Sequence, residues 1–130
     1  LEWAPQFVRG QINADESVSV SWIGRGRNGS TRQPYNSQWF EGYEVRLSQY
    51  PAPGAGSDSY YIKRVVWDSS YNFSASEITN SSAGETKSTY YVHVLPVNSL
   101  IGVSLRHYDS ALLVEGETQP SPGPIFSDGF

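Results

Sequence analysis

Residues 89–98 alternate in the pattern of an extended strand. Tyr90, Val92 and Val94 recur with a period of two, which places them on one face of a β-strand. The opposite face carries Tyr91, His93 and Leu95. Gly102, a residue type that favours turns, follows shortly after. The chain is therefore expected to contain a sheet that includes this strand.

The same alternation recurs at two earlier places. Residues 17–22 alternate between serine and apolar side chains, so Val18, Val20 and Trp22 are expected to face a core and the serines to face water. Residues 39–48 repeat the pattern. One of their faces carries Tyr43, Val45 and Leu47, and the other carries Glu44, Arg46 and Ser48. Both stretches predict strands.

Shorter signals complete the expected set. Strands are predicted at residues 7–12, 60–67, 71–75 and 103–114, the last with a bulge near Asp109. Gly and Pro together make up 20 residues, which favours turns, and no segment sustains a helical period. About seven short strands predict an all-β fold, a seven-stranded antiparallel β-sandwich, with an up-and-down barrel as the alternative.

The domain organisation follows from where proline and glycine gather. Residues 1–6 are expected to be an N-terminal linker, 7–117 the sandwich, and 118–130 a Pro/Gly-rich C-terminal linker. The chain does not start with methionine, which favours a piece of a larger protein. Residues 24–38 lack any periodicity and are expected to form a long loop.

The alternating strands also predict the core. Its expected members are Val18, Val20, Trp22, Tyr43, Val45, Tyr90, Val92 and Val94. We expect the last three to face the first three, and Val45, across the sandwich.

Composition excludes several functional classes. The chain has no Cys, so it can form neither a disulfide framework nor a thiolate metal site. A net charge of −4 argues against nucleic acid as the main partner. The apolar runs are too short to span a membrane, and no membrane insertion is expected.

Three landmarks occur in the order found in a fibronectin type III domain. Trp22 ends the second predicted strand, Tyr43-Glu44-Val45 begins the third, and Tyr90 opens the sixth at the position of a corner tyrosine. Residues 5–117 therefore resemble this immunoglobulin-like family, although Gly84 stands where the family often has leucine. The resemblance implies a binding or spacer module.

A narrower resemblance rests on residues 21–27, which read Ser-Trp-Ile-Gly-Arg-Gly-Arg, and on the later Tyr43-Glu44-Val45. These stretches are similar to a domain of tail-tip or baseplate hub proteins in long-tailed phages and gene transfer agents. The resemblance implies a non-enzymatic structural module in the virion. Its implied partners are other domains and subunits of the tail tip, and a host-surface receptor or glycan.

The long loop carries the candidate partner-binding residues, Arg25, Arg27, Tyr35 and Trp39. Its arginines would pair with an acidic neighbour or a phosphorylated glycan, or would simply solubilise the loop. An exposed aromatic side chain there would anchor a protein or stack on a sugar. Alternatively, Trp39 and Phe40 would cap the open end of the sandwich.

No catalytic chemistry is predicted. If its face of the strand is solvated, His93 is expected to be a polar strand residue rather than a catalytic one, and no Ser-His-Asp spacing involves it or His107. The aspartates lie near turns, where they usually make local hydrogen bonds, so no metal or cofactor is expected. The alternatives to a virion protein are an extracellular adhesion or receptor module at the cell surface and a carbohydrate-binding module of a secreted glycosidase.

Overall fold

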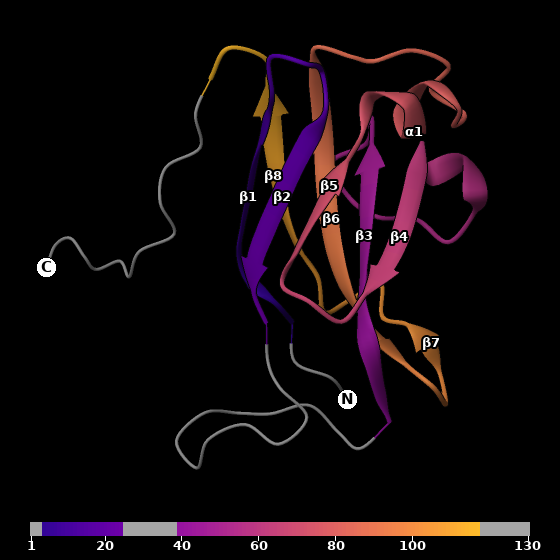
Figure 1. Cartoon of the computed structure of the whole chain (residues 1–130). Coiled ribbons are helices and arrows are strands. Elements are labelled where there is room, and N and C mark those ends of the chain that lie inside the picture. The colour runs from indigo at the N-terminus through magenta and orange to yellow at the C-terminus, as the bar shows by residue number, and fades with distance from the viewer. Residues whose placement is uncertain (1–3, 25–38, 118–130) are drawn as a thin grey trace, which may run out of the picture.

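Two antiparallel sheets pack face to face in the computed structural model, which describes residues 4–24 and 39–117 (Figure 1). The described chain is all-β apart from two short helices. Residues 25–38 of the expected loop, residues 1–3 of the expected N-terminal linker and the whole expected C-terminal linker lie outside the described residues. The first strand begins at Gln6, one residue before the expected boundary of the domain.

The smaller sheet has three strands in the order β1-β2-β5. They are β1 (Gln6–Ile12), β2 (Val18–Ile23) and β5 (Ser70–Phe73). In β2 the serines alternate with three buried side chains, as the period-two pattern predicts. Val18 lies opposite Ile12 on one neighbour and Phe73 on the other, so apolar residues meet across all three strands.

The larger sheet has five strands in the order β4-β3-β6, with β7 and β8 both paired to β6. They are β3 (Phe40–Ser48), β4 (Ile62–Val66), β6 (Thr89–Asn98), β7 (Gly102–Val103) and β8 (Asp109–Val114). A 3₁₀ turn, η1 (Ser57–Ser59), lies between β3 and β4. One helix, α1 (Ala75–Thr79), follows β5.

The described residues form eight strands rather than the predicted seven, because the strand expected over residues 103–114 is two strands, β7 and β8. The Ser104 N–H donates to the carbonyl of Pro96 at 3.1 Å and closes the short β7 hairpin. The Ser104 Oγ then accepts from the His107 N–H, which forms a turn before β8 begins. The strand expected at 60–67 is also shorter, at Ile62–Val66.

The strand predicted over 71–75 ends at Phe73, because a helix begins immediately afterwards. Ser74 caps α1 by accepting from the Glu77 N–H at 3.1 Å, and the Glu77 carboxylate accepts from the Ser74 N–H at 2.8 Å. This reciprocal capping box satisfies two donors that a helix start would otherwise leave unpaired. It makes a five-residue helix possible here.

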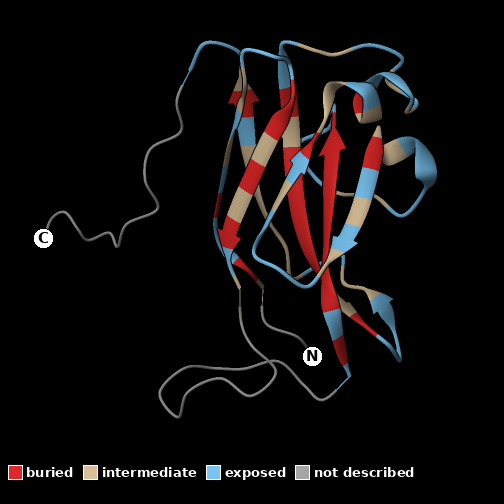
Figure 2. Cartoon of the chain, viewed as in Figure 1, coloured by how far each residue is buried: buried red, intermediate tan, exposed pale blue. Residues whose placement is uncertain are grey.

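All eight side chains expected in the core are buried there, together with further aliphatic and aromatic residues. One expected relation is wrong. Val45 does not face Val94 across the sandwich, because the two are cross-strand neighbours in the larger sheet. In β3 and β6 the residues of both faces are buried, and Figure 2 shows these strands as largely red bands.

Gly42 sits in an irregular section of β3. The register between β3 and β6 shifts between Phe40 and Tyr43, and Gly42 has a φ of +103°. A Cβ at this position would lie 2.7 Å from the Val66 carbonyl oxygen. Because of this irregularity Phe40 and Tyr43 are both buried. Their rings pack in a T-shaped arrangement, with 5.0 Å between the ring centroids.

Tyr90 fixes the start of β6. Its ring is 1% exposed, and its hydroxyl accepts a hydrogen bond from the Lys87 N–H at 2.7 Å. The rings of Tyr61 and Tyr90 pack in a T-shaped arrangement, with 6.3 Å between their centroids. A tyrosine that bonds the backbone a few residues upstream holds the chain as it crosses from one sheet to the other.

The two sheets meet where β1 and β8 lie side by side (Figure 1). The register of β1 shifts between Gln6 and Arg9, and within this irregularity the Val8 N–H donates to Asp109 Oδ2 at 3.1 Å. Gly10 allows β1 to pack closely against both neighbours, because a Cβ there would collide with the Ser19 carbonyl oxygen of β2 and would lie 3.2 Å from the Leu113 side chain of β8.

The ends of the described chain lie at opposite ends of the sandwich (Figure 1). The strands β1 and β8 run in the same direction, so the polypeptide enters where β1 begins and leaves where β8 ends.

Candidate functional site

The partner-binding loop predicted from the sequence is only partly visible. Arg25, Arg27 and Tyr35 lie outside the described residues. Trp39 is 42% exposed, and its carbonyl accepts from the Ser99 N–H at 2.8 Å, which ties the start of β3 to the end of β6. Phe40 is buried instead and belongs to the core.

The face of β6 that carries His93 is not solvated, so the condition for its expected role as a solvated polar residue is not met. The side chain is fully buried on the outer face of β6, between Arg46 and Ser110 on the neighbouring strands. The rings of His93 and Tyr108 pack in a T-shaped arrangement, with 6.1 Å between their centroids. Neither ring nitrogen hydrogen-bonds to any of the described residues.

The surroundings of His93 favour its neutral form. Burial lowers the pKa of the imidazole below its usual value, and the positive charge of Arg46 acts in the same direction. The polar backbone of Pro51 and Tyr50 opposes this shift without reversing it. At neutral pH His93 is therefore uncharged, and among residues 4–24 and 39–117 no Asp or Glu side chain hydrogen-bonds to it.

An ion pair lies buried beside His93. Arg46 Nε is 2.6 Å from Glu44 Oε2, Lys63 Nζ is 3.6 Å from Glu44 Oε1, and Arg46 Nη1 donates to the Gly54 carbonyl at 2.8 Å. These contacts fasten the chain after β3 over the outer face of the sheet. Their role is structural, since every charge of the group has a partner.

Ser104 and His107 form a hydroxyl–imidazole pair, with 3.0 Å between Oγ and Nδ1. A catalytic interpretation requires a third group that orients the histidine. The nearby Asp109 carboxylate instead accepts from the Val8 N–H. Because Ser104 Oγ also accepts from the His107 backbone, the pair is part of the turn before β8.

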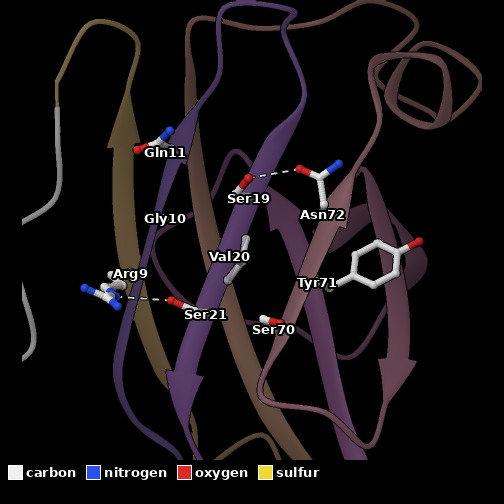
Figure 3. Close-up of a pocket in the computed structure, with 9 residues that line it drawn as sticks. All are labelled: Arg9, Gly10, Gln11, Ser19, Val20, Ser21, Ser70, Tyr71 and Asn72. Carbon is white, nitrogen blue, oxygen red and sulfur yellow. Dashed lines mark hydrogen bonds between the residues drawn. The ribbon is translucent and has the colours of Figure 1, made fainter.

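A polar trough occupies the outer face of the smaller sheet (Figure 3). Its volume is about 440 Å³. The small serines of the central strand β2 form its floor, and longer polar side chains of β1 and β5 rise on either side. The polar side chains that line it are Arg9, Gln11, Ser19, Ser21, Ser70 and Asn72.

The trough largely satisfies its own hydrogen bonds. Ser19 Oγ donates to Asn72 Oδ1 at 3.0 Å, and Arg9 Nε donates to Ser21 Oγ at 3.2 Å (Figure 3). Tyr71 points away from the trough, and its hydroxyl donates to the Glu77 carboxylate at 2.6 Å. The trough thus offers short polar side chains whose hydrogen bonds are largely internal, with the Tyr71 ring turned aside at its edge.

The alternation in β2 could have revealed this trough, since it places the serines on one face. The alternation could not reveal the width of the trough, because that width depends on which strands pair with β2 in the sheet. Within residues 4–24 and 39–117, no group of three or more His, Cys, Asp or Glu side chains is placed to hold a metal ion. No helix in the same residues has the length and apolar character needed to cross a bilayer.

Comparison with known proteins adds no relative. The chain matches no family model, and neither the curated proteins nor the solved structures contain a match.

Proposed function

We propose that the chain is a non-enzymatic spacer and binding module of the fibronectin type III kind, within a phage tail-tip or baseplate hub. The fold type is supported by the strand pairing. The first, second and fifth strands share one sheet, and β3, β6 and β8 share the other, as in immunoglobulin-like sandwiches. The bond from the Lys87 N–H to the Tyr90 hydroxyl supports the same assignment.

The spacer role rests on the path of the polypeptide. Because the chain enters at one end of the sandwich and leaves at the other, the domain separates whatever is joined to its two ends (Figure 1). The contact from Val8 to Asp109 joins the first and last strands, so the sandwich transmits displacement as one body.

The tail-tip setting is inferred from the sequence motifs. The resemblance to hub domains includes Trp22 and Tyr43. These two residues pack together in the core, with 5.7 Å between their ring centroids. The motif residues are thereby part of the architecture of the domain. The polar trough of the smaller sheet is a suitable surface for neighbouring tail subunits.

Immuno-electron microscopy tests this proposal. Antibodies raised against the chain are applied to virion preparations from the host that encodes it. Labelling at the tail tip is the expected result. Labelling of intact cell surfaces without virions would contradict the proposal and favour an extracellular adhesion module. Cross-linking with mass spectrometry then identifies whether residues of the trough, such as those near Arg9, lie against a tail subunit.

A further inference from the structure

A second hollow, unrelated to the polar trough, lies where the chain leaves β3 and returns to β4. Its volume is about 550 Å³. Three tyrosines, Tyr50, Tyr60 and Tyr61, contribute to its lining. The remaining walls are polar and include Gln49, Asp58 and Ser82. We call this feature the tyrosine cleft.

The backbone around the tyrosine cleft is held by specific hydrogen bonds. Ser48 Oγ accepts from the Tyr50 N–H at 2.9 Å and donates to the Ser59 carbonyl at 2.8 Å, which pins both sides of the loop. The Tyr61 N–H donates to the Leu47 carbonyl at 2.7 Å. The backbone of the cleft is therefore preorganised, and a ligand would not have to pay the entropy of ordering this loop when it binds.

The three rings have different surroundings. The Tyr60 ring lies beneath the Arg46 guanidinium at 4.7 Å and the Lys63 ammonium at 5.6 Å. Lys87 approaches the Tyr61 ring at 5.5 Å. Tyr50 is 46% exposed and has no such cation over it among the described residues. Tyr50 therefore has the ring face that is available for stacking, whereas cationic side chains of the protein already pack on the rings of Tyr60 and Tyr61.

The polar groups of the cleft are available to a ligand. Within residues 4–24 and 39–117, the Asp58 carboxylate takes part in no ion pair or hydrogen bond, and neither do the hydroxyls of Tyr60 and Tyr61. The Gln49 amide makes a long hydrogen bond of 3.3 Å to the Tyr50 hydroxyl. A free carboxylate beside phenol hydroxyls can bind adjacent hydroxyl groups of a polyol.

We propose that the tyrosine cleft binds a neutral saccharide, with one sugar ring on Tyr50 and its hydroxyls on Asp58. Arg46 and Lys63 already lie over the Tyr60 ring and Lys87 over the Tyr61 ring, so these two rings are engaged by the protein's own cations. An anionic ligand would meet the charge of Asp58. A purely apolar ligand would leave the carboxylate and phenol hydroxyls unpaired. A sugar supplies the apolar ring face and the hydroxyls that this set of groups complements. This site goes beyond the spacer role and does not depend on it.

The test is a binding screen of the whole chain against immobilised neutral oligosaccharides of glucose, galactose, mannose and N-acetylglucosamine. The best binder is then titrated in solution into the isotope-labelled chain. We expect NMR shift changes confined to the cleft, at Gln49, Tyr50, Asp58, Tyr60, Tyr61 and Ser82. Tyr50→Ala should weaken binding about ten-fold or more, because the stacking surface is lost, whereas Tyr50→Phe should keep most of it.

Matched variants separate this site from other surfaces. Asp58→Asn should weaken binding, and Asp68→Asn, at an exposed aspartate in the turn after β4, should leave it unchanged. Thermal melts verify that each variant folds. The proposal is overturned if no saccharide binds at up to about 10 mM, if Tyr50→Ala binds normally, or if the cleft captures unglycosylated peptides instead.

Discussion

Among single residues, His93 depends most on its surroundings. The ring is fully buried, and neither nitrogen has a partner within the described residues. A proton on this ring would place a charge in a buried site beside the positive charge of Arg46, and the polar backbone of Pro51 and Tyr50 offsets this cost only in part. The folded protein therefore opposes protonation of His93.

Stability should consequently depend on pH near the titration of His93. Burial holds its pKa below the usual 6.5, so the unfolded chain binds the proton more readily than the folded chain. This contribution is complete above about pH 6.5 and is lost as the pH falls toward the folded-state pKa. Denaturant unfolding between about pH 5 and 8 measures it. A His93→Leu variant should show a flatter profile, and an unchanged slope would refute the assignment.

At the scale of elements, the short helix α1 is joined to both sheets by one carboxylate. Glu77 Oε2 accepts from the Tyr71 hydroxyl at 2.6 Å and lies 3.0 Å from Arg64 Nη2, while Oε1 accepts from the Ser74 N–H. Tyr71 belongs to β5 of the smaller sheet, and Arg64 belongs to β4 of the larger one. The helix thereby links the two sheets at the edge opposite β1 and β8.

This network predicts a second, more acidic loss of stability. Burial raises the pKa of Glu77, but the bonds from Tyr71 and Ser74 and the charge of Arg64 outweigh it and hold the pKa below 4.5. The stabilisation is present above about pH 4.5 and is lost as the pH falls through the folded-state pKa. Glu77→Gln should lower stability at neutral pH and reduce the additional loss below pH 4.5. Acid unfolding followed by circular dichroism measures both, with Glu85→Gln as the exposed control.

The sequence predicted elements well where one pattern sufficed. Alternation placed β2, β3 and β6, and it identified the core residues between Val18 and Val94. It could not show that the outer face of β6 is covered, because that depends on residues 49–61 folding over it. The helix had a readable signal, the Ser74-to-Glu77 capping box, in a segment too short for helical periodicity.

The candidate sites were harder to predict, for a similar reason. The tyrosine cleft combines Tyr50 and Asp58 with Ser82, which follows α1 and lies far along the chain. No local pattern links such residues. Of the predicted contact residues, only Trp39 lies in the described part of the chain, where it is half-exposed.

For the whole molecule, the decisive relation is between the first and last strands. Because β1 and β8 run in the same direction and the chain leaves at opposite ends, tension along the polypeptide would load these strands in shear (Figure 1). The bond from the Val8 N–H to Asp109 Oδ2 resists that sliding directly.

Removing this bond should weaken the domain in two measurable ways. Asp109→Ala leaves the Val8 N–H without its acceptor, so we expect a loss of about 1–2 kcal/mol in the free energy of unfolding. We also expect a lower unfolding force when the chain is pulled from both ends in an optical trap. Asp109→Asn keeps an acceptor oxygen, so its free energy of unfolding and its unfolding force should be closer to those of the parent chain. Equal unfolding forces for the alanine variant and the parent would show that β1 and β8 carry no shear load.

The approach of the two sheets at Gly10 has a consequence for attempts to stabilise the protein. Replacing glycine with alanine often helps, because it reduces the conformational freedom of the unfolded chain. At Gly10 the added methyl would strike the Ser19 carbonyl and press on the Leu113 side chain at 3.2 Å. Thermostability libraries built on this chain should therefore hold position 10 fixed, even though glycine inside a strand looks like a weakness.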